Sequence, residues 1–326
     1  MPKVLITPTT LADCDGPHLE LLRAAGFDLA FPARAGQLTE QEILDALPGI
    51  SAVVAGSEPY TRRVLERARE LRVIARAGVG YDAVDLAAAT ERGVAVTITP
   101  GANNDAVAEH TLAMLLAVAK NLVPQHLDTR AGRWKREATL PLRGRTLGIV
   151  GLGRIGRSVA RRAVAFDMRV LVCEECPDQE FVSRQGLELA PLERVLAEAD
   201  FVTLHVPLTP ATRHLINRRT LALMRPTAYL INTARGGLVN EADLLDALRA
   251  GRLAGAALDV FEEEPPGNNP LFALDNVLVT PHTAGIDLQS RIDMAIQAAQ
   301  SIVTLARGGW PADQVVNPEV KARFRW

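Results

Sequence analysis

The sequence predicts an α/β protein of two domains, each built around a parallel sheet. Three observations lead to this prediction. The chain has 326 residues, about twice the length of a typical domain. Short β-branched runs alternate with amphipathic segments of helical period almost from end to end. A glycine-rich motif stands near the middle of the chain, between one such run and one such segment.

Composition excludes several classes of protein. Hydrophobic residues make up 48% of the chain and charged residues 23%, as in ordinary globular proteins. The net charge of −2 gives no electrostatic case for nucleic acid or for an anionic membrane surface. The longest apolar stretch, residues 112–119, is far shorter than the roughly 18 residues that a membrane span needs. Residues 3–7 read as a strand rather than a signal peptide, so we expect a cytoplasmic protein.

The first third of the chain predicts a small open α/β domain. Apolar runs rich in Val, Ile and Ala are separated by segments whose apolar residues recur at helical spacing. The expected strands are residues 3–7, 28–31, 52–55, 72–76 and 94–98, and the expected helices are residues 17–25, 40–47 and 61–69. This order of elements is typical of a flavodoxin-like sheet.

A second series of strands begins at residue 146 and predicts a larger domain. Its expected strands are residues 146–150, 169–173, 201–205, 228–232, 255–258 and 277–280, and its expected helices are residues 154–166, 192–199, 218–223, 241–250 and 287–306. Six strands in two halves fit a doubly wound sheet. The last helix follows the sixth strand, and no further strand of this domain comes after it. We therefore expect the chain to return to the first domain, giving a discontinuous domain of residues 1–98 and 285–326 around a domain of residues 99–284.

The glycine motif predicts that the larger domain is a Rossmann domain. Gly151, Gly153 and Gly156 directly follow the apolar strand and open a helical pattern. The first glycine allows a tight turn, the second lets a pyrophosphate approach the backbone, and the third lets helix and strand pack closely. The N–H groups and dipole of the helix start then hold the phosphates. A dinucleotide is the expected cofactor.

An acidic residue at the end of the next strand predicts NAD rather than NADP. The Glu174 carboxylate can accept hydrogen bonds from both ribose hydroxyls of NAD and would repel the 2′-phosphate of NADP. Residues 175–180 offer no Arg or Lys to receive that phosphate. Val206 and Pro207, at the end of the following strand, are expected to border the same cofactor.

Cysteine usage has two possible interpretations. Three cysteines, Cys14, Cys173 and Cys176, are too few for a disulfide framework in a chain of this length. The CxxC spacing of the last two is also found in zinc and redox sites. A structural zinc site needs four ligands, and no second Cys or His pair lies at suitable spacing. The motif ends a strand among carboxylates, which raise thiol pKa values, so packing beside the cofactor is the preferred interpretation and no metal is expected.

Three residues at strand ends predict the chemistry. Interconverting an alcohol and a ketone with NAD requires a cation for a substrate carboxylate, a proton shuttle and a group that tunes the shuttle. Arg235 follows the fourth strand of the larger domain and can bind both oxygens of a carboxylate. His282 follows the last strand and is the natural proton shuttle. Glu264, just past the fifth strand, would favour the protonated imidazole and orient its ring.

The other histidines are expected to be structural. His110 and His205 lie where they could touch the cofactor cleft, although packing is the better interpretation. His18, His126 and His214 show no such placement.

In four blocks the chain resembles the D-isomer-specific 2-hydroxyacid dehydrogenases, on the branch of phosphoglycerate dehydrogenase. These blocks are residues 76–82, the glycine motif, residues 232–237, and residues 259–265 followed by Pro281 and His282. The resemblance runs from about residue 53 to the last helix. It implies a hydride transfer between NAD(H) and a small D-2-hydroxy acid or 2-oxo acid, with Arg235, Glu264 and His282 as the catalytic trio.

The resemblance also implies roles for residues that the motifs alone do not assign. Thr233 and Asp259 would hold the nicotinamide end of the cofactor, and Arg154 and Ile155 would contact the pyrophosphate through backbone. The backbone of Gly78 and Val79 would meet the substrate carboxylate, together with Arg235 and His282. A homodimer built on the cofactor domain is implied, which points to the helix at residues 106–120 and the arm around Trp134.

Departures from the family pattern leave alternatives open. Glu174 stands where Asp is more usual, which leaves the preference for NAD intact. The loop at residues 56–60 lacks the basic side chains that a phosphorylated substrate would favour, although 3-phosphoglycerate stays an alternative substrate. A formate dehydrogenase of this fold would have a Gln–His pair in place of the Glu–His pair, so Glu264 argues against that activity. Phosphite oxidation stays open, as does an NADH-sensing corepressor, a binding protein of the same fold.

Overall fold

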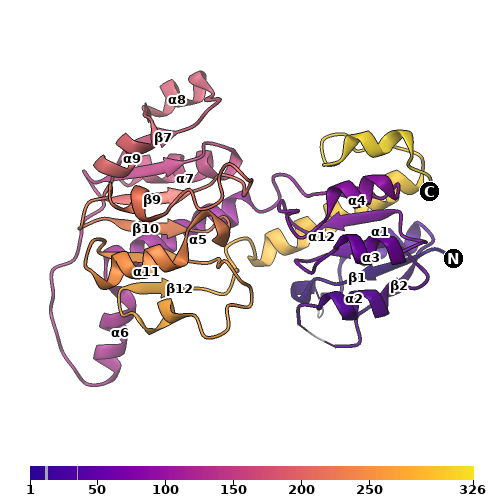
Figure 1. The fold of residues 1–326 in the computed structure, drawn as a ribbon, viewed down its shortest axis with the longest axis horizontal. Coiled ribbons are helices and arrows are strands. Elements are labelled where there is room, and N and C mark those ends of the chain that lie inside the picture. Colours follow the sequence, from indigo (N-terminus) through magenta and orange to yellow (C-terminus); the bar gives the residue numbers. More distant parts are fainter. Residues whose placement is uncertain (12–13, 35) are drawn as a thin grey trace. The chain divides into compact units, whose positions relative to one another are not determined.

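The computed structural model describes residues 1–11, 14–34 and 36–326 and confirms an α/β architecture with two parallel sheets (Figure 1). The chain divides into two compact units. The five-stranded unit comprises Met1–Asn103 and Gly285–Trp326, and the seven-stranded unit comprises Asn104–Ala284. The first unit is therefore discontinuous in sequence, and both chain ends belong to it.

The sheet of the five-stranded unit contains each strand expected from the sequence. The strands are β1 (Lys3–Ile6), β2 (Asp28–Ala30), β3 (Ile50–Ala55), β4 (Val73–Arg76) and β5 (Ala95–Thr97). They pair in parallel in the order β2-β1-β3-β4-β5. This is the flavodoxin-like order, in which the chain changes direction across the sheet between β1 and β3.

Helices cover both faces of this sheet, which explains why its strands are almost uniformly apolar. They are α1 (Pro17–Ala24), α2 (Glu40–Ala46), α3 (Arg62–Arg67), α4 (Leu86–Glu91) and α12 (Leu288–Ala306). One core joins the sheet to α2, α3 and α4 around Ile43 and Leu65, and another joins it to α1 and α12 around Leu22 and Ile302. Helix α4 was not predicted, because its single turn and a half of Ala-rich sequence is too short to show a period.

The seven-stranded unit contains one strand more than expected. The strands are β6 (Thr146–Val150), β7 (Arg169–Cys173), β8 (Glu188–Leu189), β9 (Phe201–Leu204), β10 (Tyr229–Asn232), β11 (Gly255–Leu258) and β12 (Val277–Val279). Their order is β12-β11-β10-β9-β6-β7-β8, with every pair parallel. The two-residue β8 pairs with β7 at the edge of the sheet and is too short for an alternating pattern. This is the doubly wound Rossmann topology, extended by one strand.

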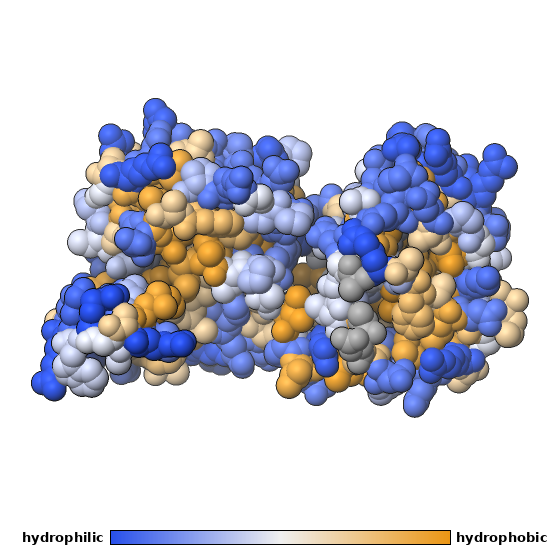
Figure 2. Space-filling view, turned by 90° about the horizontal axis from the view of Figure 1, so that it is seen from below, coloured by the Kyte–Doolittle hydropathy of each residue, from blue (hydrophilic) through white to orange (hydrophobic). Residues whose placement is uncertain are grey.

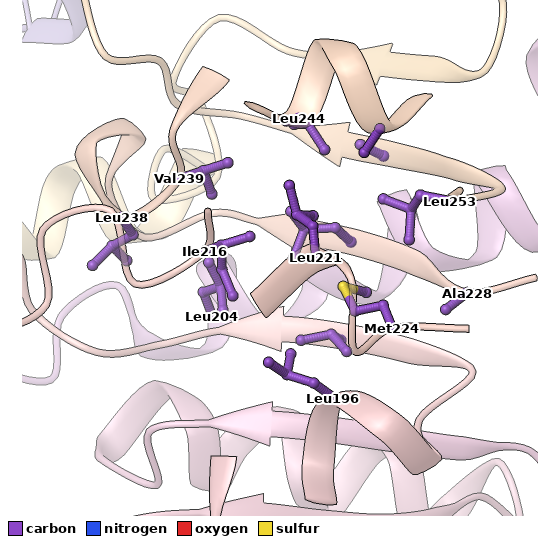
Figure 3. Close-up of a cluster of buried hydrophobic side chains, with 14 of the residues drawn as sticks. Leu196, Leu204, Ile216, Leu221, Met224, Ala228, Leu238, Val239, Leu244 and Leu253 are labelled. Atoms are coloured by element: carbon purple, nitrogen blue, oxygen red, sulfur yellow. The ribbon is translucent and has the colours of Figure 1, made fainter. Parts of the chain in front are cut away.

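Two cores flank the larger sheet. The helices of this unit are α5 (Asn104–Ala119), α6 (Leu122–Arg130), α7 (Arg154–Ala165), α8 (Gln179–Gln185), α9 (Leu192–Glu198), α10 (Arg218–Leu221) and α11 (Glu241–Arg249). Figure 3 shows the core beneath α9, α10 and α11, where Leu196, Leu221 and Leu244 meet the strand residue Leu204. The opposite core joins the sheet to α5, α7 and α8. Helices α6 and α8 were not predicted, since α6 buries no residue and has no apolar stripe.

Short 3-10 turns complete the fold: η1 (Thr9–Leu11), η2 (Gly236–Leu238), η3 (Pro270–Ala273) and η4 (Pro318–Ala322). Among the described residues no single helix is long and apolar enough to cross a membrane. Helices α5 and α6 pass that test only when taken together across a 60° bend, and α5 is largely buried in the core of its unit.

Candidate active site

The glycine motif forms a cradle between β6 and α7. Gly151 has φ +98°, and a Cβ there would lie 2.7 Å from the His205 carbonyl carbon and 2.9 Å from a Val206 methyl group. A Cβ at Gly156 would lie 2.1 Å from the Gly151 oxygen, so only glycine lets this turn and helix meet. Gly153, by contrast, faces open space and caps α7 without any side-chain hydrogen bond to the free N–H groups. The cradle is thus shaped for an anion such as a pyrophosphate.

The other residues expected to contact the cofactor lie at the start of α7 and just after β9. Helix α7 begins at Arg154, whose side chain is exposed, and Ile155 is half-buried. Val206 and Pro207 follow β9, the strand next to β6 in the sheet. These backbone segments leave the sheet at the carboxyl ends of its central strands, where open α/β sheets bind ligands.

Glu174 ties the end of β7 to the glycine motif. Its carboxylate accepts hydrogen bonds from the Leu152 N–H at 2.6 Å and from the Cys176 N–H at 3.1 Å. Arg157, in the first turn of α7, donates to the Leu152 carbonyl at 3.1 Å and pairs with Asp178 at 2.9 Å. This arginine is therefore already paired with an acid.

The CxxC cysteines beside Glu174 are free thiols. Burial and the neighbouring Glu174, Glu193 and Glu175 carboxylates raise the pKa of Cys173, which keeps its thiol protonated and unreactive. No group of three His, Cys, Asp or Glu side chains in residues 1–11, 14–34 and 36–326 is arranged to hold a metal ion.

Arg235 is carried by a turn that Asn232 folds. The buried Asn232 amide donates to the Arg235 carbonyl at 2.8 Å and accepts from the Ala234 N–H at 3.0 Å. The next residue, Gly236, lies so close to the following loop that a Cβ there would be 1.8 Å from the Phe261 carbonyl carbon. The turn bearing Arg235 and the loop leading to Glu264 are thereby pressed together, a contact that only glycine permits.

The structure brings Glu264 and His282 into direct contact. The His282 Nδ1 lies 2.6 Å from Glu264 Oε2, and the other carboxylate oxygen accepts from the Phe261 N–H at 3.0 Å. Burial alone would raise the pKa of Glu264, but the hydrogen bond and charge of His282, the Phe261 amide and the Arg235 guanidinium together lower it. The carboxylate is therefore ionised at neutral pH and orients the imidazole through Nδ1, which leaves Nε2 for a substrate.

The backbone of His282 is held in an unfavourable conformation. Its φ of +54° lies in the left-handed region, which costs a residue with a side chain about 1–2 kcal/mol. Its N–H donates to the Asp259 carbonyl at 2.8 Å, which fixes the residue at the end of β12. Such strain is typical of a residue whose side chain must point in one direction.

Asp259 anchors the segment that carries His282. This fully buried carboxylate accepts from the Thr280 hydroxyl at 2.5 Å, the Thr283 N–H at 2.9 Å and the Ala284 N–H at 2.8 Å. Thr280 also lies 3.1 Å from His110 Nε2. Sequence reasoning missed Thr280, and its place between an apolar strand and Pro281 was the only available signal. The other nicotinamide candidate, Thr233, is buried and lies 2.8 Å from the Thr111 hydroxyl.

His205 is unsuited to proton transfer. Burial lowers its pKa to about 3, so the imidazole is neutral throughout the physiological range. Its Nε2 lies 3.0 Å from the Thr203 hydroxyl, and its carbonyl group packs under Gly151. The residue thus shapes the glycine cradle.

Gly78 and Val79 belong to the five-stranded unit, whereas the trio belongs to the seven-stranded unit. Gly78 follows β4 with φ +155°, and the space beside its Cα is open. Its carbonyl accepts from the Thr99 N–H at 3.0 Å, and the Gly80 carbonyl accepts from Arg76 Nε at 2.8 Å. The N–H groups of residues 78–80 donate to no group in the described part of this unit. Successive open amides of this kind suit an anion.

Comparisons with known proteins identify the family of the chain. Residues 112–284 match the family model of the D-isomer specific 2-hydroxyacid dehydrogenase, NAD binding domain. The chain is 43% identical over 284 residues to the D-3-phosphoglycerate dehydrogenase of Methanocaldococcus jannaschii, covering 86% of this chain but 54% of that protein. It is 41% identical over 297 residues to the glyoxylate reductase of Pyrococcus furiosus, covering 88% of each. The crystal structure of Aquifex aeolicus D-lactate dehydrogenase with NAD and lactic acid superposes with a TM-score of 0.85 at 28% identity, over 96% of this chain and 99% of that one.

Proposed function

The chain belongs to the D-isomer specific 2-hydroxyacid dehydrogenase family, and we propose that it reduces a small 2-oxo acid with NADH, or oxidises the matching D-2-hydroxy acid with NAD. The observation that carries this proposal is the contact between His282 Nδ1 and Glu264 Oε2 beside Arg235. This combination provides a proton shuttle, its orienting carboxylate and a cation for the substrate.

Each member of the trio has a distinct task in the proposed reaction. When bound, NADH supplies a hydride to C2 of the 2-oxo acid. Arg235 binds the substrate carboxylate and fixes which face of C2 is presented. His282 Nε2 donates a proton to the carbonyl oxygen, so that the product is an alcohol rather than an alkoxide. Glu264 stabilises the imidazolium before the transfer and holds the ring in line through Nδ1.

The cofactor is held by the cradle of Gly151, Gly153 and Gly156, with the first turn of α7 facing the pyrophosphate. Glu174 supports NAD over NADP, because the carboxylate charge opposes a 2′-phosphate and Arg157 is already paired with Asp178. Thr233 and Asp259 are assigned to the nicotinamide end. The hydrogen bonds that Asp259 accepts from the segment at residues 280–284 link this assignment to the placement of His282.

Replacing Glu174 by alanine is expected to lower the preference for NADH over NADPH by tenfold or more, as measured by the ratio of the two kcat/KM values. One removed like charge beside the 2′-phosphate is worth about one pK unit of interaction, or roughly tenfold. Glu174→Gln, which removes the charge but keeps an acceptor for the Leu152 N–H, separates the charge effect from loosening of the glycine turn. An unchanged ratio in both variants would place the discrimination elsewhere.

The proposed substrate is a small 2-oxo acid without a second anionic group. The turn at residues 56–60 carries no Lys or Arg, and neither does the turn at residues 78–83. A second candidate, 3-phosphohydroxypyruvate, is supported by the phosphoglycerate dehydrogenase relative, of which the chain spans about half the length. Glyoxylate is supported by a relative that the chain covers almost fully.

The direct test follows NADH oxidation with glyoxylate, hydroxypyruvate, pyruvate, phenylpyruvate, 2-oxoglutarate and 3-phosphohydroxypyruvate, with NADPH as the control cofactor. Turnover of glyoxylate or hydroxypyruvate with NADH at a higher kcat/KM than the phosphorylated acid supports the proposal. The highest kcat/KM for 3-phosphohydroxypyruvate would favour the second candidate. Tight NADH binding without turnover of any acid would contradict the enzymatic proposal and favour a nucleotide-sensing role.

We further propose that the protein is a homodimer built on the seven-stranded unit. Helix α6 buries none of its residues, and Leu122, Leu127 and the nearby Trp134 are 52%, 56% and 75% exposed. Figure 2 shows apolar surface on the side of this unit where α6 lies. Exposed apolar side chains gathered in this way are typical of an interface between subunits.

A Leu127→Glu variant is expected to sediment as a monomer at micromolar concentration, because a charge in the centre of an apolar interface is left without a partner. Leu223→Glu is the matched control, since Leu223 is 38% exposed and follows α10, which packs on the opposite face of the sheet. Analytical ultracentrifugation of both variants decides the matter. A dimeric Leu127→Glu protein would rule out this surface.

A further inference from the structure

A buried carboxylate stands at the carboxyl ends of β1 and β3 in the five-stranded unit. The Glu58 side chain belongs to a residue that is only 2% exposed, and Thr7 and Tyr60 beside it are 4% and 0% exposed. Thr7 directly follows β1, and Glu58 lies three residues beyond β3. The chain switches direction across the sheet between these two strands, which is where open α/β sheets place their ligand loops.

Glu58 folds its own loop around one oxygen atom. Glu58 Oε1 accepts from the Gly56 N–H at 3.0 Å, from the Tyr60 hydroxyl at 3.0 Å and from the Thr7 hydroxyl. The Thr7 hydroxyl also accepts from the Gly56 N–H at 3.2 Å. Burial and the Glu58 charge raise the pKa of Tyr60, so its hydroxyl remains a donor at any physiological pH. The loop at residues 56–60 is thus fixed at three points.

Tyr60 connects this loop to the turn that follows β4. The Tyr60 N–H donates to the Ala83 carbonyl at 2.8 Å, and the Tyr60 carbonyl accepts from the Asp85 N–H at 3.0 Å. Within the same turn, Arg76 Nε donates to the Gly80 carbonyl at 2.8 Å. Arg76 therefore holds the turn at residue 80 and Tyr60 holds it at residues 83 and 85, directly after the open N–H groups of residues 78–80.

Burying the Glu58 carboxylate costs free energy of folding, and the packing of the sheet does not explain why it is buried. Moving a carboxylate out of water is strongly unfavourable. Here the hydrogen bonds that Glu58 Oε1 accepts, together with the bond between Gly56 and Thr7, offset this desolvation cost. The sheet itself does not require a charge at this position, because both of its cores are apolar. What the network does fix is the relative position of two loops at the carboxyl edge of the sheet.

We propose that Glu58 and Tyr60 are positioning residues, which hold the N–H groups of residues 78–80 in place for the carboxylate of the 2-oxo acid. This role rests on the proposed function. Neither residue touches the substrate. They act by keeping the amides fixed before binding, so that little ordering is needed when the carboxylate arrives. The role concerns substrate affinity rather than the hydride or proton transfer.

The test compares Glu58→Gln and Tyr60→Phe with the wild-type enzyme. Glu70→Gln serves as the control, because Glu70 is an exposed acid between α3 and β4 of the same five-stranded unit. Both network variants are expected to raise KM for the preferred 2-oxo acid about tenfold, the scale of one lost hydrogen bond to a charged group. The kcat is expected to stay within about twofold and the NADH Kd unchanged. Glu70→Gln should match wild type throughout.

Hydrogen–deuterium exchange provides a readout independent of activity. In both network variants the amides of residues 77–84 are expected to exchange at least tenfold faster, while β3 and β4 stay protected as in wild type. A rise in KM with unchanged kcat and faster exchange in this turn supports the positioning role. Unchanged KM and exchange in the folded Tyr60→Phe protein would overturn it, as would an equal loss of kcat in both variants. Wild-type enzyme that reduces none of the acids would overturn the proposed function instead, whereas the exchange result would still report on the turn.

Discussion

Replacing His282 by alanine is expected to lower kcat by about 100-fold or more, the usual scale for the loss of a general acid. The imidazole is the only proton donor of the trio at neutral pH, since Glu264 is ionised there and Arg235 does not release its proton. His205 does not substitute for it, because burial lowers the pKa of that ring to about 3. The measurement is steady-state kcat for the preferred 2-oxo acid with saturating NADH.

The Glu264→Gln variant is the graded companion to this experiment. Glutamine still accepts a hydrogen bond from His282 Nδ1, but it no longer provides the negative charge that stabilises the imidazolium. The pKa of Glu264 is held below its ordinary value, so the charge is present in the wild-type enzyme from mildly acidic pH upward and is lost only as the pH falls through that pKa. We expect a smaller fall in kcat than for His282→Ala. Wild-type kcat in His282→Ala would remove this residue from the mechanism.

Replacing Arg235 by alanine is expected to lower kcat/KM for 2-oxo acids by about 100-fold or more while leaving the NADH Kd unchanged. Hydrogen bonds to charged groups are worth about 1.5–3 kcal/mol, and roughly the upper figure is lost from the transition state with the paired bonds of the guanidinium. The cofactor cradle is built by the β6–α7 turn and does not involve Arg235, so its affinity should be preserved. Stopped-flow or fluorescence titration with NADH separates the two effects.

Arg235→Lys tests whether charge or shape matters at this position. Lysine keeps the positive charge but offers a single ammonium group in place of the planar pair of donors, so we expect it to restore only part of the lost kcat/KM. A variant with alanine at position 235 and native kcat/KM would show that another cation binds the carboxylate. Loss of NADH affinity in both variants would indicate instead that the turn packed against Phe261 had been disturbed.

The periodic elements of the fold and the positions of the main site residues were predictable because both depend on sequence neighbours. Apolar runs and helical spacing are repeated every two to four residues, so amphipathic helices such as α7 and α12 and all strands of more than two residues could be found. Helix α5 was expected only from the family resemblance. The glycine motif was recognisable because each glycine answers a local demand, and Arg235 and His282 were recognisable because they follow apolar strands. The two-residue β8 and the short α4 were not predicted, because neither contains enough residues to show a periodic pattern.

The tertiary structure alone decided which distant residues meet. Nothing near Gly236 in sequence reveals that its Cα lies against Phe261, a contact that brings the turn of Arg235 onto the loop of Glu264. Likewise, an acidic residue in a loop is expected to be solvated, yet Glu58 is buried. Its burial is possible because Thr7, some fifty residues earlier, lies at the end of the neighbouring strand and donates a hydrogen bond to it. The order of strands in a sheet sets such pairings. Local spacing determined what each segment of this protein is, whereas the sheet order determined what each segment touches, because burial and hydrogen bonding between strand ends depend on neighbours in space.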